Sequence, residues 1–140
     1  MEIRPYSHYC ESEIRSLYKA VGWKNYYEHP EMLRMAYENS LCVFGAIEDG
    51  TLIGVIRAVG DGVSILFVQD IIVHPQHQRK GIGTRLMKAL LERYGHVYQI
   101  QLMTDNTEKT KAFTIPLDSK RWMNTGAVDL HDLNNREAIP

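Results

Sequence analysis

The sequence predicts an α+β fold of three layers, in which a mixed, mostly antiparallel central sheet carries helices on both faces. Three β-rich runs, at residues 41–47, 51–59 and 63–73, are joined by Asp-Gly turns, a pattern typical of an antiparallel meander. The third run is apolar on both faces over several positions, as expected of a central strand covered by helices. A helix-period segment and another β-rich run follow it. That order favours parallel pairing of the last two strands.

The N-terminal part predicts a short strand and a first amphipathic helix. The strand, at residues 3–6, is expected to end where Pro5 removes a ladder donor. Either Glu11 or Ser12 can cap the helix, and Gly22 closes it. One apolar stripe is formed by Ile14, Leu17, Tyr18 and Val21.

A second helix is expected to begin at Pro30, because proline suits the first helical position. Residues 23–29 before it form an aromatic, turn-like connector. The apolar side of this helix consists of Met32, Leu33, Met35, Ala36 and Tyr37. Core packing is the preferred interpretation of this stripe of methionine and aromatic residues.

Composition indicates one domain spanning residues 1–140, because 44% hydrophobic residues in 140 suit a single core. With 16 basic and 17 acidic residues, no global field attracts nucleic acid or an anionic membrane. No run reaches the roughly 18 apolar residues of a membrane span, and the N-terminus lacks an apolar signal core. We therefore expect a cytoplasmic protein with neither nucleic acid nor membrane as partner.

The cysteines and histidines give no support for a metal site or a disulfide framework. Cys10 and Cys42 lie far apart and form no C-x-x-C pair. The six histidines show no ligand spacing with acids or cysteines. We expect free thiols and no metal.

The most particular pattern lies at residues 70–87, where a β run stopped by Pro75 leads through Gly81 and Gly83 into a helix that is expected to stop at Gly95. The first amides of a helix have no internal partner, and the helix dipole adds positive potential there. Glycines leave no Cβ to hold a phosphate away from these amides. Further donors and positive charge come from Gln78, Arg79 and Lys80.

Other interpretations of this loop are less specific. A Rossmann fingerprint needs a third glycine where Leu86 stands, and a P-loop needs Gly-Lys rather than the Lys80-Gly81 order found here. A plain strand-to-helix turn on a glycine hinge remains the simplest alternative.

Together with Val73-His74-Pro75, the run Gln78-Arg79-Lys80-Gly81-Ile82-Gly83 resembles the acetyl-CoA pyrophosphate loop of the GNAT superfamily of N-acetyltransferases, whose signature is Gln/Arg-x-x-Gly-x-Gly/Ala after a strand. The resemblance covers residues 1–113. It implies a splay between the parallel strands, where unpaired backbone groups bind the pantetheine arm. The cofactor-binding residues that it implies are Ile71, Ile72, Val73, Gln78, Arg79, Lys80, Gly81, Ile82, Gly83, Thr84 and Asn106.

Asn106 lies near the start of a polar-faced helix expected at residues 104–113. In the family, an asparagine there commonly contacts the pantetheine or the leaving thiol. A cap or turn asparagine is an equally open interpretation.

The resemblance implies acetyl transfer from acetyl-CoA to a primary amine of a small molecule or protein by direct attack. Asp70 is the candidate base or amine-orienting residue, with a structural acid as the alternative; Gln69 points to the opposite face of the strand. In the family the first two helices often wall the acceptor site. The candidate acceptor contacts are therefore Trp23, Tyr26, Tyr27 and Met35. A monomer or a homodimer is expected.

The sequence departs from the family pattern after Phe113. Thr114 stands where the family's tyrosine would protonate the departing thiolate, and Pro116 would break the helix. Two explanations are open for residues 114–122. One is a compensated frameshift, because loss of one base can convert codons for Tyr-His-Ser-Leu-Gly-Phe into codons for the residues found here. The other is residue-by-residue divergence. Impaired activity follows from the missing tyrosine, and the alternative function is a CoA-binding module with weak or no catalysis.

Overall fold

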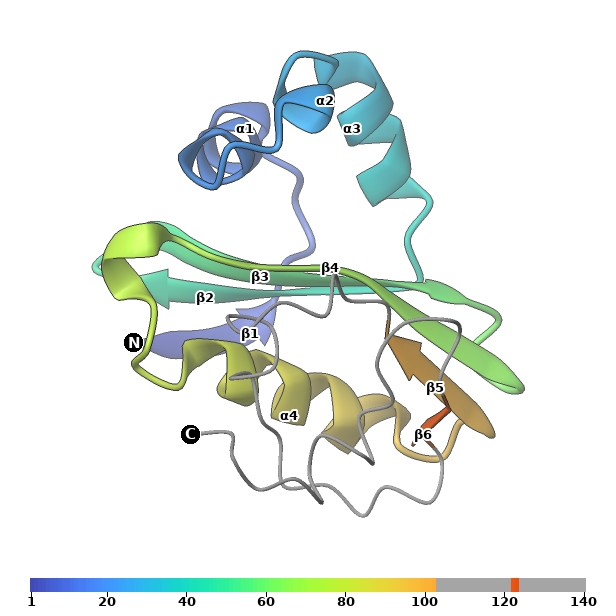
Figure 1. The fold of residues 1–140 in the computed structure, drawn as a ribbon. Helices are drawn as coiled ribbons and strands as arrows, with labels where there is room; N and C mark the ends of the chain where they lie inside the picture. The colour runs from blue at the N-terminus through green and yellow to red at the C-terminus, as the bar shows by residue number, and fades with distance from the viewer. Residues whose placement is uncertain (103–121, 124–140) are drawn as a thin grey trace.

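The computed structural model describes residues 1–102 and 122–123. A central sheet separates α1, α2 and α3 on one face from α4 on the other (Figure 1). This is the three-layer α+β arrangement that the sequence predicts.

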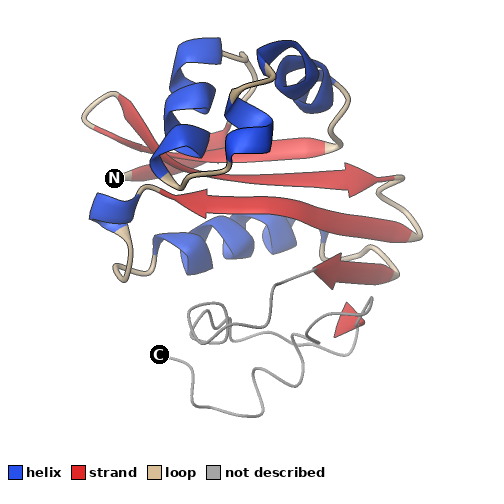
Figure 2. Ribbon diagram, turned by 45° about the horizontal axis from the view of Figure 1, so that its top comes forward, coloured by secondary structure: helices blue, strands red, loops and turns tan. Residues whose placement is uncertain are grey.

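Within the described residues, the sheet has six strands in sequential order from β1 to β6. The first four pair antiparallel, whereas β4 with β5 and β5 with β6 pair parallel (Figure 2). The predicted meander and parallel crossover are confirmed. The strands are β1 (Glu2–Pro5), β2 (Cys42–Glu48), β3 (Thr51–Gly60), β4 (Ile65–Val73), β5 (Gln99–Leu102) and β6 (Trp122–Met123).

The helices are α1 (Glu11–Ala20), α2 (Lys24–Tyr27), α3 (Pro30–Glu38), the 3-10 turn η1 (Pro75–His77) and α4 (Ile82–Tyr94). Pro30 is the first residue of α3, as predicted. The aromatic connector contains the short helix α2, which the sequence did not predict. None of the helices in the described part of the chain is long and apolar enough to cross a membrane.

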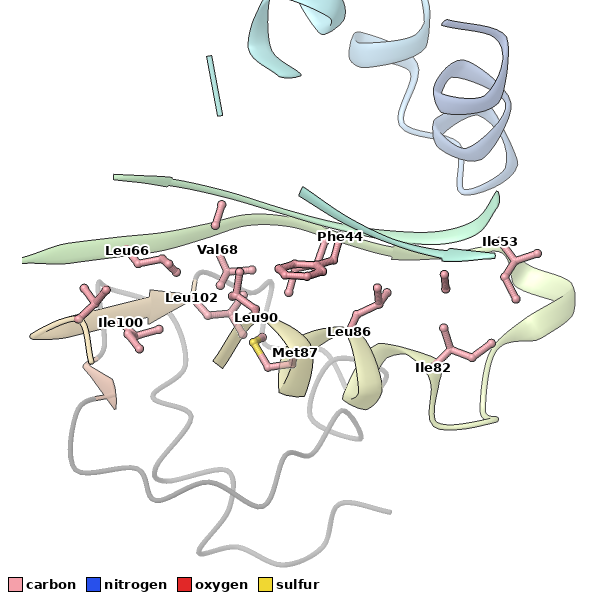
Figure 3. Packing of buried hydrophobic residues seen from close by; sticks show 14 residues of the cluster. Phe44, Ile53, Leu66, Val68, Ile82, Leu86, Met87, Leu90, Ile100 and Leu102 are labelled. Carbon is pink, nitrogen blue, oxygen red and sulfur yellow. The ribbon is translucent and has the colours of Figure 1, made fainter. Parts of the chain in front are cut away.

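Two hydrophobic cores lie on opposite faces of the sheet. The core under α4 includes Phe44, Ile53, Leu66, Val68, Ile82, Leu86, Met87, Leu90, Ile100 and Leu102 (Figure 3). The core under α1 and α3 consists of Ile14, Leu17, Tyr18, Leu33, Tyr37, Leu52, Val55 and Ile72. β4 contributes Leu66 and Val68 to the first core and Ile72 to the second, as expected of a central strand.

The two Asp-Gly turns differ in geometry. Asp49 and Gly50 both have positive φ, at 51° and 79°, so the predicted tight hairpin turn is confirmed. Asp61 does not repeat it. Its side chain instead accepts hydrogen bonds from the Ser64 hydroxyl and from three amides, those of Val63, Ser64 and Ile65, and these bonds hold the pKa of its carboxyl well below the usual range.

One predicted helix end, the N-cap of α1, is wrong. The N-cap of α1 is Cys10, with no side-chain hydrogen bond to the helix, so neither Glu11 nor Ser12 caps it. α4 ends at Tyr94 with Gly95 as its C-cap, so the predicted stop is confirmed, although Gly95 has φ −63° and is not left-handed. Gly22 after α1 does have positive φ, at 77°, as predicted. The expected helix at residues 104–113 lies outside the described residues.

Candidate functional site

A β-bulge divides β4 at Gln69. Arg57 of β3 is the partner of Asp70, but the next residue, Ala58, is the partner of Val68, which leaves Gln69 unmatched. A bulge adds one residue to a strand and re-aims the side chains beyond it. Val68 accordingly belongs to the core under α4, whereas Ile72 belongs to the core under α1 and α3.

Among the described residues, the pairing of β4 with β5 also ends before Gln69. It runs from Ile65 opposite Gln99 to Val68 opposite Leu102, while β4 continues to Val73. Within the described residues, no strand pairs with this edge of β4 at residues 69–73. Three of the expected cofactor contacts, Ile71, Ile72 and Val73, lie on this segment.

The loop after β4 is fixed to the end of the strand. The His74 amide donates to the Ile53 carbonyl at 2.8 Å, and Gln78 Nε2 donates to the Val73 carbonyl at 3.0 Å. The side chain of Gln78 therefore holds the loop against the end of β4. The expected contact between Gln78 and a phosphate stays a prediction.

The backbone of the loop reverses at two left-handed residues before α4. Arg79 has φ 64° and Gly81 has φ 79°, and a Cβ added at Gly81 would meet no atom within 4 Å. Alternating left- and right-handed residues make amide concavities that bind anions. The first of the helical hydrogen bonds runs from the Arg85 amide to the Gly81 carbonyl at 3.0 Å, so the amides of Ile82 and Gly83 precede it. The opening formed by these amides at the start of α4 suits a phosphate group.

The side chains around the opening are mostly cationic or small. Arg79, Lys80 and Arg85 are exposed, and no acid of the described residues forms an ion pair with them. Ile82 is buried in the core under α4, so only its backbone can contact a ligand. Thr84 is half-buried in the first turn of the helix.

Asp70 lies in a buried polar cluster on the other face of the sheet. Its Oδ2 accepts hydrogen bonds from Arg57 Nε and from the Tyr18 hydroxyl, both at 2.8 Å. The Tyr18 hydroxyl also lies 2.8 Å from that of Tyr37, and Arg57 Nη1 donates to Ser40 Oγ at 3.2 Å. Asp70 is thus joined to α1 through Tyr18 and to β3 through Arg57.

Burial and neighbouring groups shift the pKa values of Tyr18, Tyr37 and Arg57 in this cluster. Burial raises the pKa of Tyr18 far above the usual range, and the neighbouring Tyr37 and Asp70 add to the shift. Burial also raises the pKa of Tyr37. For Arg57, burial acts to lower the pKa, but Asp70 outweighs it and the net pKa is raised. The tyrosines are therefore neutral donors and the arginine is charged.

The candidate acceptor contacts only partly come together. The ring of Tyr18 lies 5.9 Å from that of Trp23 and 5.2 Å from that of Tyr26. Trp23 is exposed, so these rings connect the surface to the Asp70 cluster. Met35 is exposed on α3, and the Tyr27 carbonyl accepts a hydrogen bond from Arg15. Asn106 and Thr114 lie outside the described residues.

The sequence matches the model of the acetyltransferase (GNAT) family over residues 7–114. The chain belongs to the GNAT acetyltransferase family. A solved GNAT family acetyltransferase from Streptococcus pneumoniae TIGR4 is 43% identical, with 80% of this chain and 81% of that chain covered and a TM-score of 0.72. No curated protein matched the sequence.

Two more distant acetyltransferase structures support the fold alone. An acetyltransferase from Brucella melitensis in complex with acetyl-CoA is 22% identical, covering 79% of each chain with a TM-score of 0.60. The aminoglycoside 6′-N-acetyltransferase from Enterococcus faecium is 18% identical, covering 73% of this chain and 61% of that chain with a TM-score of 0.64.

The sequence interpretation missed the partners of Asp70. Arg57 is the one charge within the apolar run of residues 51–59, and a charge in a buried strand needs a partner. That signal could have shown that Arg57 has a buried partner, but not that the partner is Asp70. Tyr18 and Tyr37 gave no such signal, because a tyrosine on an apolar helix stripe is ordinary core. Among the described residues, no group of three or more His, Cys, Asp or Glu could hold a metal ion.

Proposed function

We propose that this GNAT acetyltransferase uses acetyl-CoA as the acetyl donor and a primary amine as the acceptor. The observation that carries the proposal is the loop before α4. Left-handed Arg79 and Gly81 leave the first helix amides open, and cationic side chains surround them. This arrangement suits a pyrophosphate, the group that CoA presents to a helix N-terminus.

In this proposal the amides of Ile82 and Gly83 hold the pyrophosphate, and Arg79 and Lys80 balance its charge. The edge of β4 at residues 69–73 offers backbone groups to the pantetheine arm. Acetyl-CoA supplies the acetyl thioester. The acceptor nitrogen loses a proton and bonds to the acetyl carbon while the carbon–sulfur bond breaks, and the departing thiolate takes up a proton.

Asp70 remains the candidate that receives the acceptor's proton or orients the amine. Its Oδ2 already accepts two hydrogen bonds, and the described residues donate none to Oδ1. Direct contact with an amine would therefore use Oδ1, or a bridging water. Because the side chain is only 2% exposed, a structural role for Asp70 competes with this assignment.

A CoA-binding module with weak or no activity is the second candidate. The observation that favours it is Thr114, which stands where the family's thiolate-protonating tyrosine is expected. We favour the enzyme, because direct transfer depends mainly on positioning and a thiolate can take a proton from water. The proposed setting is cytoplasmic, with a monomer or homodimer as the working unit.

The test is acetyl transfer itself. The protein is incubated with acetyl-CoA and a panel of small-molecule and peptide amines, and release of free CoA thiol is followed. Samples without amine correct for hydrolysis and for the protein's own thiols, Cys10 and Cys42. Amine-dependent thiol release with an acetylated amine product supports the enzyme. Acetyl-CoA binding without transfer to any amine supports the CoA-binding module.

A further inference from the structure

We propose that Arg57 is a positioning residue. It fixes the segment of β4 beyond the bulge in the position that acetyl-CoA binding requires. The inference rests on the proposed function, since it assigns a purpose to the edge of β4 at residues 69–73. Arg57 acts through Asp70 and touches neither substrate.

The first step is the position of the ion pair. Arg57 and Asp70 are register partners in the ladder immediately after the bulge at Gln69. Their side chains are 7% and 2% exposed, and Arg57 Nε lies 2.8 Å from Asp70 Oδ2. The first residue of β4 beyond the bulge is thus fixed to β3 by a side-chain bond in addition to the backbone ladder.

The second step is that both partners are themselves held. The guanidinium of Arg57 lies over the Tyr37 ring at 5.5 Å and donates to Ser40 Oγ. Asp70 also accepts from Tyr18 of α1. Two helices and two strands therefore meet at this ion pair, so β4 cannot shift there without breaking several buried interactions.

The third step separates positioning from stability. A buried ion pair contributes little net stability compared with apolar side chains of similar size, but it can fix register. Register needs such a device here, because loss of the bulge would slip the pairing beyond it by one residue and reverse the side chains there. The same slip would also redirect the backbone groups of residues 71–73, which follow the last described pair between β4 and β5.

The test replaces the ion pair by apolar residues in the double variant Arg57→Met with Asp70→Leu. Melting temperature and the Kd for acetyl-CoA, measured by calorimetry, are compared with those of the unmodified protein. We expect a folded protein whose Kd rises about tenfold. A core variant, Leu33→Val, should lower the melting temperature and leave the Kd unchanged. A double variant that binds acetyl-CoA as the unmodified protein does would overturn the inference.

A matched tyrosine pair tests the same cluster without moving a charge. Tyr18→Phe removes a hydroxyl that donates to Asp70, whereas Tyr37→Phe removes one whose hydrogen-bond partner among the described residues is Tyr18. The Kd should rise more for Tyr18→Phe than for Tyr37→Phe, and equal values would contradict the inference. If the unmodified protein itself fails to bind acetyl-CoA, the proposed function fails and the inference with it. If it binds and no variant differs, only the inference fails.

Discussion

Arg57 and Asp70 form a buried ion pair across β3 and β4, with 2.8 Å between Nε and Oδ2. The pair lies directly after the bulge at Gln69, in the part of β4 that follows its last described pair with β5. Each charge is satisfied by the other and by hydroxyl groups of Tyr18 and Ser40. Removing one partner therefore leaves an uncompensated charge inside the protein.

Asp70→Asn should destabilise the protein by about 3–5 kcal/mol, because it strands the Arg57 charge in the core. The free energy of unfolding in urea measures this. Asp49→Asn is the matched control, since Asp49 lies in a turn with φ 51° and asparagine tolerates that conformation. The control should stay within about 0.5 kcal/mol of the unmodified protein. Equal stability of the two variants would show that the ion pair is not holding this region.

The cations of the loop should contribute modestly to acetyl-CoA binding. Arg79→Ala and Lys80→Ala should each weaken binding by about 0.2–1 kcal/mol, because both side chains are exposed and partly screened. Calorimetric titrations at low and high salt measure this loss, which should shrink as salt rises. The control, Lys24→Ala, lies on α2 and should leave binding unchanged. A loss that salt does not alter would contradict an electrostatic role.

Cys42 should react slowly with alkylating reagents. Burial raises the pKa of its thiol to about 11, against a smaller opposing effect of Arg93. Only the thiolate reacts, so about one thiol in a thousand is reactive at pH ~8, and the rate should rise about tenfold per pH unit up to the pKa. Mass spectrometry of iodoacetamide-treated Cys10→Ser protein measures this rate. Equal rates in the native and urea-unfolded protein at pH ~8 would contradict the raised pKa.

The segment at residues 114–119 should limit turnover. Rebuilding it as Tyr-His-Ser-Leu-Gly-Phe should raise kcat with little change in the Kd for acetyl-CoA, because protonating a leaving group acts on the transition state. Thr114→Tyr alone should not restore the rate, since Pro116 disfavours helical geometry in the residue before it. Steady-state rates with an accepted amine measure both. An unchanged kcat in the rebuilt protein would show that the missing tyrosine is not limiting.

The sequence predicted those parts of the fold that depend on local chemistry. Asp49-Gly50 specified its turn, Pro30 began α3, and the apolar run of β4 identified a central strand. It failed where tertiary contacts decide. Cys10 is the N-cap of α1 and makes no side-chain hydrogen bond to the helix, although the local sequence suggests Glu11 or Ser12 as the cap.

The candidate site divides in the same way. The loop at residues 78–83 was recognisable because its chemistry resides in consecutive residues. The ion pair was not, because Arg57 and Asp70 lie thirteen positions apart and meet only through strand register. The bulge at Gln69 is equally invisible, since an extra residue in one strand shows only against its partner.

Acetyl-CoA binding by Gly81→Val tests the central claim, that the loop before α4 binds CoA, most directly. Gly22→Val is the matched control: both glycines have φ near 80°, at 79° and 77°, and neither Cβ would meet an atom within 4 Å. The two substitutions impose the same strain, about 1–3 kcal/mol, but Gly22 follows α1 on the opposite face of the sheet from α4 (Figure 1). Calorimetry should show normal binding by Gly22→Val and at least about tenfold weaker binding by Gly81→Val. Equal affinity for acetyl-CoA in the two variants would contradict the account.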